Sequence, residues 1–149
     1  MLRIGDYEPG PYAGIGSRQT PLPVMDLMTE MARLLDARGF TLRSGGAIGA
    51  DTAFERGATK KEIYLAEQAI SPEAFALAEI YHPAWHRCDQ WARRLHARNC
   101  YQVLGRDLRT PARFVLCWTQ GGTGRGGTGQ AIRIARAHGV PVFDMGRMH

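Results

Sequence analysis

The segment that most constrains the fold lies near the C-terminus, where a strand, a glycine-rich turn, a helix and a second strand follow one another directly. Residues 113 to 118 (RFVLCW) are a nearly continuous apolar run, typical of a central parallel strand buried on both faces. Six glycines occupy the nine positions from 121 to 129. Residues 129 to 139 (GQAIRIARAHG) then predict a helix, and 140 to 143 (VPVF) a last strand. This order predicts a parallel α/β sheet.

The rest of the chain repeats the alternation. Strands are predicted at 11 to 16, 40 to 43 and 62 to 65, and helices at 22 to 38, 50 to 56, 71 to 81 and from about 85 onward. Ser71 is the expected N-cap of the third helix, with Pro72 at its first position. The apolar side of the first helix is predicted to consist of Met25, Leu27, Met28, Met31, Ala32, Leu34 and Leu35. We therefore expect one Rossmann-like α/β domain over residues 1–149, with a mostly parallel sheet of about five strands and helices on both faces.

Composition narrows the class of protein. No apolar run is long enough to span a bilayer, and the N-terminus lacks the apolar core of a secretory signal, so we expect a cytoplasmic protein without a membrane partner. Three cysteines without CxxC spacing predict reduced thiols rather than a disulfide framework. Residues 1 to 83 carry eight basic and eleven acidic side chains, whereas residues 84 to 149 carry eleven and three. The positive field therefore belongs to the C-terminal half.

Three glycine-bearing turns, at 14 to 17, 44 to 49 and 121 to 129, follow predicted strands. Parallel strands end at one edge of a sheet, so all three turns are expected at that edge. Glycine lets a ligand approach the backbone amides, and a helix N-terminus behind the turn favours anions. The turns therefore predict a phosphate site, although none is a Walker A loop or a complete dinucleotide fingerprint.

Four segments resemble one family. SGGAIGADTAFERGA (44 to 58) looks like the SGG-x-x-G-x-D loop and helix of the DprA (Smf) proteins, and YAGIGSRQTP (12 to 21) resembles their G-x-R opening turn. HARN (96 to 99) resembles their Arg-Asn pair, and residues 126 to 143 resemble their final loop, helix and strand. The chain is thus similar to the DprA/LOG-like, or SLOG, superfamily of Rossmann-like domains, including its small phage or prophage-type members.

The resemblance implies binding of a nucleotide, a nucleotide-derived ligand or nucleic acid. LOG phosphoribohydrolases carry PGGxGTxxE, and the glutamate position of that motif holds Ala131 here, which argues against their reaction. DprA proteins bind single-stranded DNA, usually with flanking domains that 149 residues cannot hold. Three functions remain open: a nucleotide-binding module, a DprA-like single-stranded DNA-binding protein, and a nucleotide N-glycoside hydrolase. A homodimer is compatible with each.

The expected ligand and phosphate contacts come from the three turns and from the Arg-Asn pair. They are Gly16, Ser17, Arg18, Ser44, Gly45, Gly46, Gly49, Asp51, Arg98, Asn99, Gly126, Gly127, Thr128, Gly129 and Gln130. If the protein is an enzyme, Asp51 and Glu55 are the candidate catalytic pair, because they lie four residues apart on one helical face.

Several of these residues also have a structural interpretation. Ser17 would hold a phosphate or cap a helix, and Asp51 would bind a ribose hydroxyl or tie down its own loop. The Asp51–Glu55 pair would flank a cleft or lie on a solvated surface. Seven arginines between residues 84 and 113 would neutralise nucleic-acid phosphates or form the solvent-exposed face of a helix. They are Arg87, Arg93, Arg94, Arg98, Arg106, Arg109 and Arg113.

The tryptophans, and the histidines and cysteines between residues 82 and 100, also have both a functional and a structural interpretation. Trp85, Trp91 and Trp118 would stack on bases or pack in the core. The metal-ligating residue types in this region are His82, His86, Cys88, His96 and Cys100. His96 and Cys100 are four residues apart and could share a helical face, but zinc sites usually show tighter ligand pairs. His86 and His96 lie roughly 80° apart around an ideal helix. We therefore expect no bound metal and no cofactor.

Overall fold

The computed structural model describes residues 3 to 147, and its centre is a five-stranded sheet in which every neighbouring pair is parallel. The strands are β1 (Pro11–Gly14), β2 (Thr41–Ser44), β3 (Lys61–Ile63), β4 (Val115–Cys117) and β5 (Val142–Asp144), in the spatial order β3-β2-β1-β4-β5. The Rossmann-like fold class and the strand positions are confirmed, with boundaries displaced by at most two residues.

Between residues 3 and 147, five α-helices and four short 3-10 helices accompany these strands. The α-helices are α1 (Leu22–Ala37), α2 (Ala50–Gly57), α3 (Pro72–Tyr81), α4 (Gln90–Leu104) and α5 (Gly127–Ala137). The 3-10 turns are η1 (Ile4–Asp6), η2 (Trp85–Arg87), η3 (Gln120–Gly122) and η4 (Met145–Arg147). As expected, Ser71 caps α3, since its hydroxyl accepts a hydrogen bond from the Ala74 amide at 3.2 Å.

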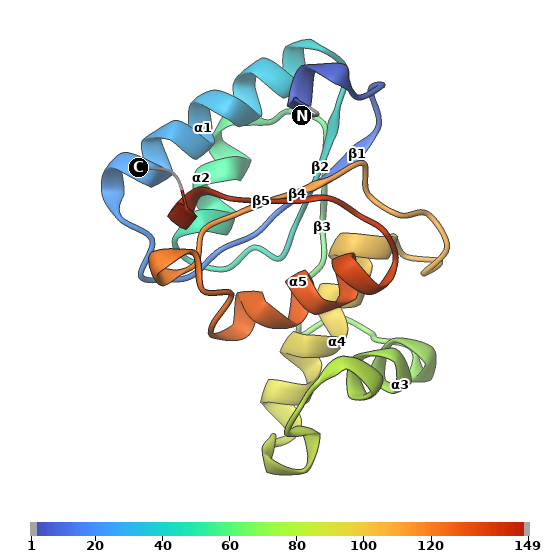
Figure 1. Cartoon of the computed structure of the whole chain (residues 1–149). Helices are drawn as coiled ribbons and strands as arrows, with labels where there is room; N and C mark the ends of the chain where they lie inside the picture. Colours follow the sequence, from blue (N-terminus) through green and yellow to red (C-terminus); the bar gives the residue numbers. More distant parts are fainter. Residues whose placement is uncertain (1–2, 148–149) are drawn as a thin grey trace.

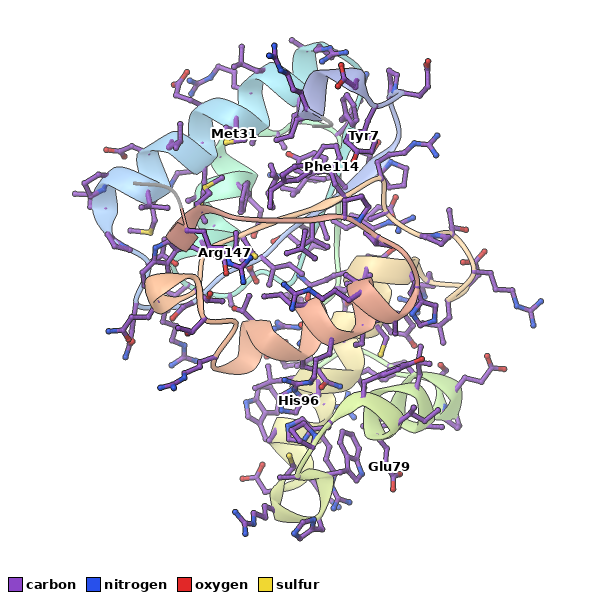
Figure 2. The ribbon with its side chains drawn as sticks, viewed as in Figure 1. Tyr7, Met31, Glu79, His96, Phe114 and Arg147 are labelled. Carbon is purple, nitrogen blue, oxygen red and sulfur yellow. The ribbon has the colours of Figure 1, made fainter. Side chains whose placement is uncertain are left out.

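The helices cover both faces of the sheet, so the molecule has two apolar cores (Figure 1). Helices α1 and α2 pack on one face, over Tyr12, Leu42 and Phe114. Figure 2 shows Tyr7 and Phe114 close together on this side, to the right of Met31 of α1. The second core joins α3, α4 and α5 to the opposite face, where Ala13 and Val115 point. The alternation of neighbouring strand residues between the two cores follows from the pleat of a strand.

The strand order places a topological switch point between β1 and β4. The β1–α1 connection leaves toward one face, and the β4–α5 connection leaves toward the other, so a crevice opens between them at the carboxyl ends of the strands. The three glycine turns follow β1, β2 and β4, which are neighbours in the sheet. The prediction that these turns meet along one edge is confirmed.

Two local predictions need correction. Leu27 and Leu34 were assigned to the buried side of α1, but they are 44% and 66% exposed, and the buried positions are Met28, Ala32 and Leu35. The helix expected from about residue 85 begins at Gln90, because the side chain of Asp89 accepts the Ala92 amide at 2.8 Å and caps it there. Among residues 3 to 147, none of the helices combines the length and apolar composition that a bilayer crossing requires.

Candidate nucleotide and nucleic-acid site

The start of α5 is the most open anion site on this edge. Gly126 is its N-cap, with φ +84°, and no side chain caps the helix. Within the described chain, the amides of Gly126, Gly127 and Thr128 donate no backbone hydrogen bond. Gly126 and Gly127 are exposed, and a Cβ at either would meet nothing within 4 Å. Free amides at the positive end of a helix dipole are a suitable seat for a phosphate.

A cavity of about 310 Å³ adjoins this helix start at the switch point. It lies between the end of β1, one face of α4 and the beginning of α5. The residues that line it are Ile15, Ala92, Leu95, His96, Arg98, Asn99, Gly127 and Thr128. The predicted residues Arg98, Asn99, Gly127 and Thr128 thus meet in one place, although they come from two segments of the chain.

Arg98 and Asn99 of α4 connect this helix to the second and third glycine turns through hydrogen bonds. Asn99 is 4% exposed, and its Nδ2 donates to the carbonyl of Gly127 at 3.4 Å, which holds the start of α5 against α4. The Arg98 guanidinium donates from Nη1 to the carbonyl of Gly45 at 2.9 Å, which fixes the second turn. Burial lowers the pKa of Arg98, and the nearby charge of Asp51 opposes that effect. Both residues therefore position the loops as well as lining the cavity.

The second glycine turn is occupied by the protein's own groups. The amide of Ala47 donates to Asp51 Oδ2 at 3.2 Å, and the amide of Gly46 donates to Ser44 Oγ at 3.3 Å. The Ser44 hydroxyl in turn donates to Glu55 Oε2 at 3.0 Å. The carboxylate of Asp51 thus sits where an external anion was expected. This favours the structural interpretation of Asp51, Ser44 and Gly46 over direct phosphate binding.

The remaining glycines of the first two turns allow close packing. Gly49 has φ +99°, and a Cβ there would lie 2.9 Å from the Ser17 carbonyl oxygen. A Cβ on Gly16 would lie 2.4 Å from the Ala50 Cβ. Gly45 is buried under the Arg98 guanidinium, 2.7 Å from where its Cβ would stand. These glycines bring the first turn against the second rather than opening either to a ligand.

Asp51 and Glu55 do not form a catalytic pair facing the cavity, since neither lines it. Asp51 is 2% exposed, and burial raises its pKa to about 6, while the Arg98 charge opposes this shift. Its Oδ1 has no hydrogen-bond partner within the described residues. Glu55 is partly buried against the Ser44 hydroxyl. The two carboxyl groups stabilise the base of the second turn.

The first turn leaves a basic side chain at the rim. Ser17 Oγ accepts the Gln19 amide at 2.9 Å, and the Ser17 carbonyl accepts the Thr20 hydroxyl at 2.6 Å. Ser17 therefore stabilises the turn, and α1 begins only at Leu22. Arg18 is exposed and makes no hydrogen bond or ion pair with another described residue through its guanidinium, so it is available to a phosphate.

Gln130 and Gly129 serve the packing of α5. Gln130 is fully buried, and its Nε2 donates to the Ala78 carbonyl at 2.8 Å while its Oε1 accepts from Arg133 at 2.8 Å. Arg133 is partly buried and also donates to the Tyr81 carbonyl. A Cβ on Gly129 would lie 2.2 Å from the Gly124 carbonyl oxygen. Neither residue presents a free side chain to the cavity.

Two residues of the edge were missed by sequence reasoning. Ile48 is 76% exposed in the second turn, and Arg125 is exposed in the third. Both stand among glycines, where side chains that do not fold inward project from the backbone. A large apolar or cationic residue inside a glycine-rich turn is the signal that could have identified them.

Some arginines between residues 84 and 113 hydrogen-bond to the protein's own backbone, and others are exposed to solvent. Arg93 donates to the Trp85 carbonyl and lies over the Trp85 ring, and Arg94 donates to the Ala66 carbonyl. Arg87, Arg106, Arg109 and Arg113 are exposed. Of the tryptophans, Trp91 is 47% exposed, whereas Trp85 and Trp118 pack against the two cores.

Comparisons with known proteins bear on the fold. No family model matches the sequence, and no curated protein matches it. One solved structure does: DNA processing protein A from Helicobacter pylori, studied for its unique mode of single-stranded DNA binding. The TM-score is 0.63 at 21% sequence identity, and the match covers 93% of this chain but 66% of the other. The chain thus has a DprA-like fold and spans about two thirds of that protein's length.

Proposed function

We propose that this protein binds single-stranded DNA along the carboxyl edge of its sheet, with one phosphate at the start of α5. The observation that carries the proposal is the set of unpaired amides at Gly126, Gly127 and Thr128 beside a cavity at the switch point. The structural neighbour, DNA processing protein A, binds single-stranded DNA, and its fold is similar to that of this chain.

The chemistry of the rim suits a single strand. Arg18 and Arg125 are exposed on the first and third turns and would contact successive phosphates. Ile48 offers an exposed apolar surface between them in chain order, against which an unstacked base could pack. A duplex hides the faces of its bases, so an edge of this kind favours the single strand.

A nucleotide-like small molecule is the second candidate. The cavity of about 310 Å³ is at the small end of ligand pockets, large enough for part of a mononucleotide. In this case the phosphate would again lie at the start of α5, and the base and sugar would enter between Asn99 and Ile15. The N-glycoside hydrolase is not supported by the geometry, because Asp51 and Glu55 lie outside this cavity.

Fluorescence anisotropy with labelled deoxythymidine oligonucleotides of increasing length tests the proposal. Affinity should rise with length and fall with salt, and each of Arg18→Ala and Arg125→Ala should reduce the logarithmic salt slope by about 0.7. Arg109→Ala is the matched control, because Arg109 is also exposed but precedes β4 and thus lies toward the opposite edge.

Two outcomes would contradict the single-strand proposal. Equal losses in Arg109→Ala and Arg18→Ala would indicate binding by diffuse charge rather than by this edge. Binding of mononucleotides as tight as that of a long oligonucleotide would favour the small-molecule ligand instead. Incubation with nucleoside monophosphates, followed by detection of free base, checks the hydrolase separately.

A further inference from the structure

A cluster of three potential metal ligands lies beside the cavity, at the end of α3 and on α4. One donor atom from each of His82, Cys88 and His96 falls within 4.8 Å of the other two. His82 Nε2 and Cys88 Sγ are 3.7 Å apart, and the rings of His82 and His96 have centroids 4.4 Å apart. Figure 2 shows His96 on the part of α4 that extends away from the sheet.

This spacing fits a tetrahedral ion. With bond lengths of about 2.3 Å to sulfur and 2.0 Å to nitrogen, two ligands of one tetrahedral zinc ion lie about 3.5 Å apart. The sulfur–nitrogen distance of 3.7 Å is already close to that value. The sequence spacing does not show that these three side chains meet, because His82 precedes η2, Cys88 follows it and His96 lies inside α4.

One imidazole nitrogen of the cluster has no partner in the described part of the protein. His96 Nδ1 is buried and has no hydrogen-bond partner within the described residues. A buried, unpaired imidazole nitrogen costs free energy unless something binds to it.

Two features set the chemistry of the ion. Arg133 and Arg98 place positive charge near His96, which opposes a bare dication. A thiolate at Cys88 would supply the compensating negative charge, and thiolate with imidazole is the ligand set of Zn²⁺. The Ala84 amide also donates to His82 Nδ1 at 3.0 Å, which places the proton of the neutral ring on Nε2. Metal binding through Nε2 must therefore displace that proton and break this bond.

We propose that His82, Cys88 and His96 form a zinc-binding site with one coordination position left for water or a ligand oxygen. Three protein ligands and one open position are the arrangement of catalytic rather than structural zinc. His96 also lines the cavity at the switch point, so the site and the cavity share a wall. The proposal concerns the ion alone and does not depend on DNA binding.

Titration of the reduced, full-length chain with Co²⁺ and with Zn²⁺ tests this site. One Co²⁺ should bind per chain and give a thiolate-to-cobalt charge-transfer band in the near ultraviolet, which Zn²⁺ removes by competition. Cys88→Ser should abolish the band, and His82→Asn and His96→Asn should each weaken binding at least tenfold. His86→Asn is the matched control, because His86 is exposed two residues before Cys88 and lies outside the cluster.

A second measurement uses the unaltered protein. Cys88 is partly buried, whereas Cys100 and Cys117 are buried, so a thiol reagent such as Ellman's should react first with Cys88. One equivalent of Zn²⁺ should slow that reaction at least tenfold. The proposal is overturned if Co²⁺ gives no charge-transfer band, if folded Cys88→Ser binds the metal as well as the parent chain does, or if Zn²⁺ leaves the Cys88 thiol equally reactive.

Discussion

Gly127 and Gly129 are two residues apart at the start of α5 and have different roles. A Cβ on Gly127 would meet no other atom of the described chain within 4 Å, so the absence of a side chain at Gly127 matters only to a ligand that approaches the helix start. Gly129 faces inward, against the carbonyl of Gly124. The glycine-rich sequence therefore combines a ligand-facing position with a packing position.

Substitution by alanine should separate these two roles. Gly127→Ala should change the free energy of unfolding by less than about 1 kcal/mol, because its Cβ meets no neighbour. It should nevertheless weaken oligonucleotide binding roughly tenfold, or by about 1.4 kcal/mol, by screening the free amides. Gly129→Ala should destabilise the fold by about 2 kcal/mol or more. Thermal unfolding and fluorescence anisotropy measure the two effects. Unchanged DNA affinity in Gly127→Ala would show that no DNA phosphate binds at the start of α5.

Asp51 gives a pH dependence with a defined sign. Its folded pKa of about 6 is above the ordinary value of 3.8, so the native state holds this proton more tightly than the unfolded chain does. Its contribution to stability should therefore be greatest below pH 4 and should decline as the pH rises from about 4 to 6, by on the order of 3 kcal/mol. Asp51→Asn replaces the titrating carboxyl group with an amide, so this pH dependence should be absent in the variant.

Urea unfolding of both proteins at several pH values measures this effect. The difference in free energy of unfolding between the parent chain and Asp51→Asn should change across pH 4 to 6 and be constant above about pH 7. Parallel curves across the whole range would show that Asp51 titrates at its ordinary pKa. The carboxylate would then be better solvated than its burial indicates.

At the level of the helices, α4 and α5 each bury a glutamine, with opposite consequences. Gln102 of α4 and Gln130 of α5 are both 0% exposed. Neither amide atom of Gln102 has a partner within the described residues, whereas both amide atoms of Gln130 are hydrogen-bonded. A buried amide without partners loses its hydration and gains nothing in exchange.

Leucine at these two positions should therefore act in opposite directions. Gln102→Leu should raise the free energy of unfolding by about 1–2 kcal/mol, because it removes an unpaired polar group while keeping the volume. Gln130→Leu should lower it by about 1–3 kcal/mol, because the Ala78 carbonyl and Arg133 lose their partner. Differential scanning calorimetry checks both, and destabilisation by Gln102→Leu would indicate an unseen partner for that amide.

For the whole molecule, folding and binding should respond differently to salt. The described residues contain two ion pairs, Arg33–Glu30 between exposed side chains and Arg43–Glu62 at 3.7 Å. The exposed Arg33–Glu30 pair contributes little, and the buried guanidinium of Arg43 is shielded from salt ions. Raising the salt from about 50 to 500 mM should therefore move the midpoint of thermal unfolding by only a few degrees. DNA affinity should fall by an order of magnitude or more over the same range. A large salt effect on unfolding would reveal unseen charge interactions within the fold.

The sequence determined the sheet, most helix boundaries and the meeting of the three glycine turns, because each depends on local periodicity, on caps such as Ser71, and on the rule that parallel strands end at one edge. Only the tertiary structure decided which turn is open to an anion. Asp51 fills the second turn and the amides of Gly127 and Thr128 remain free, because hydrogen bonds depend on distances between segments that the sequence does not specify. The same reason applies to Arg43, buried in β2 where its guanidinium reaches the carbonyl of Thr110, and to the approach of His82, Cys88 and His96.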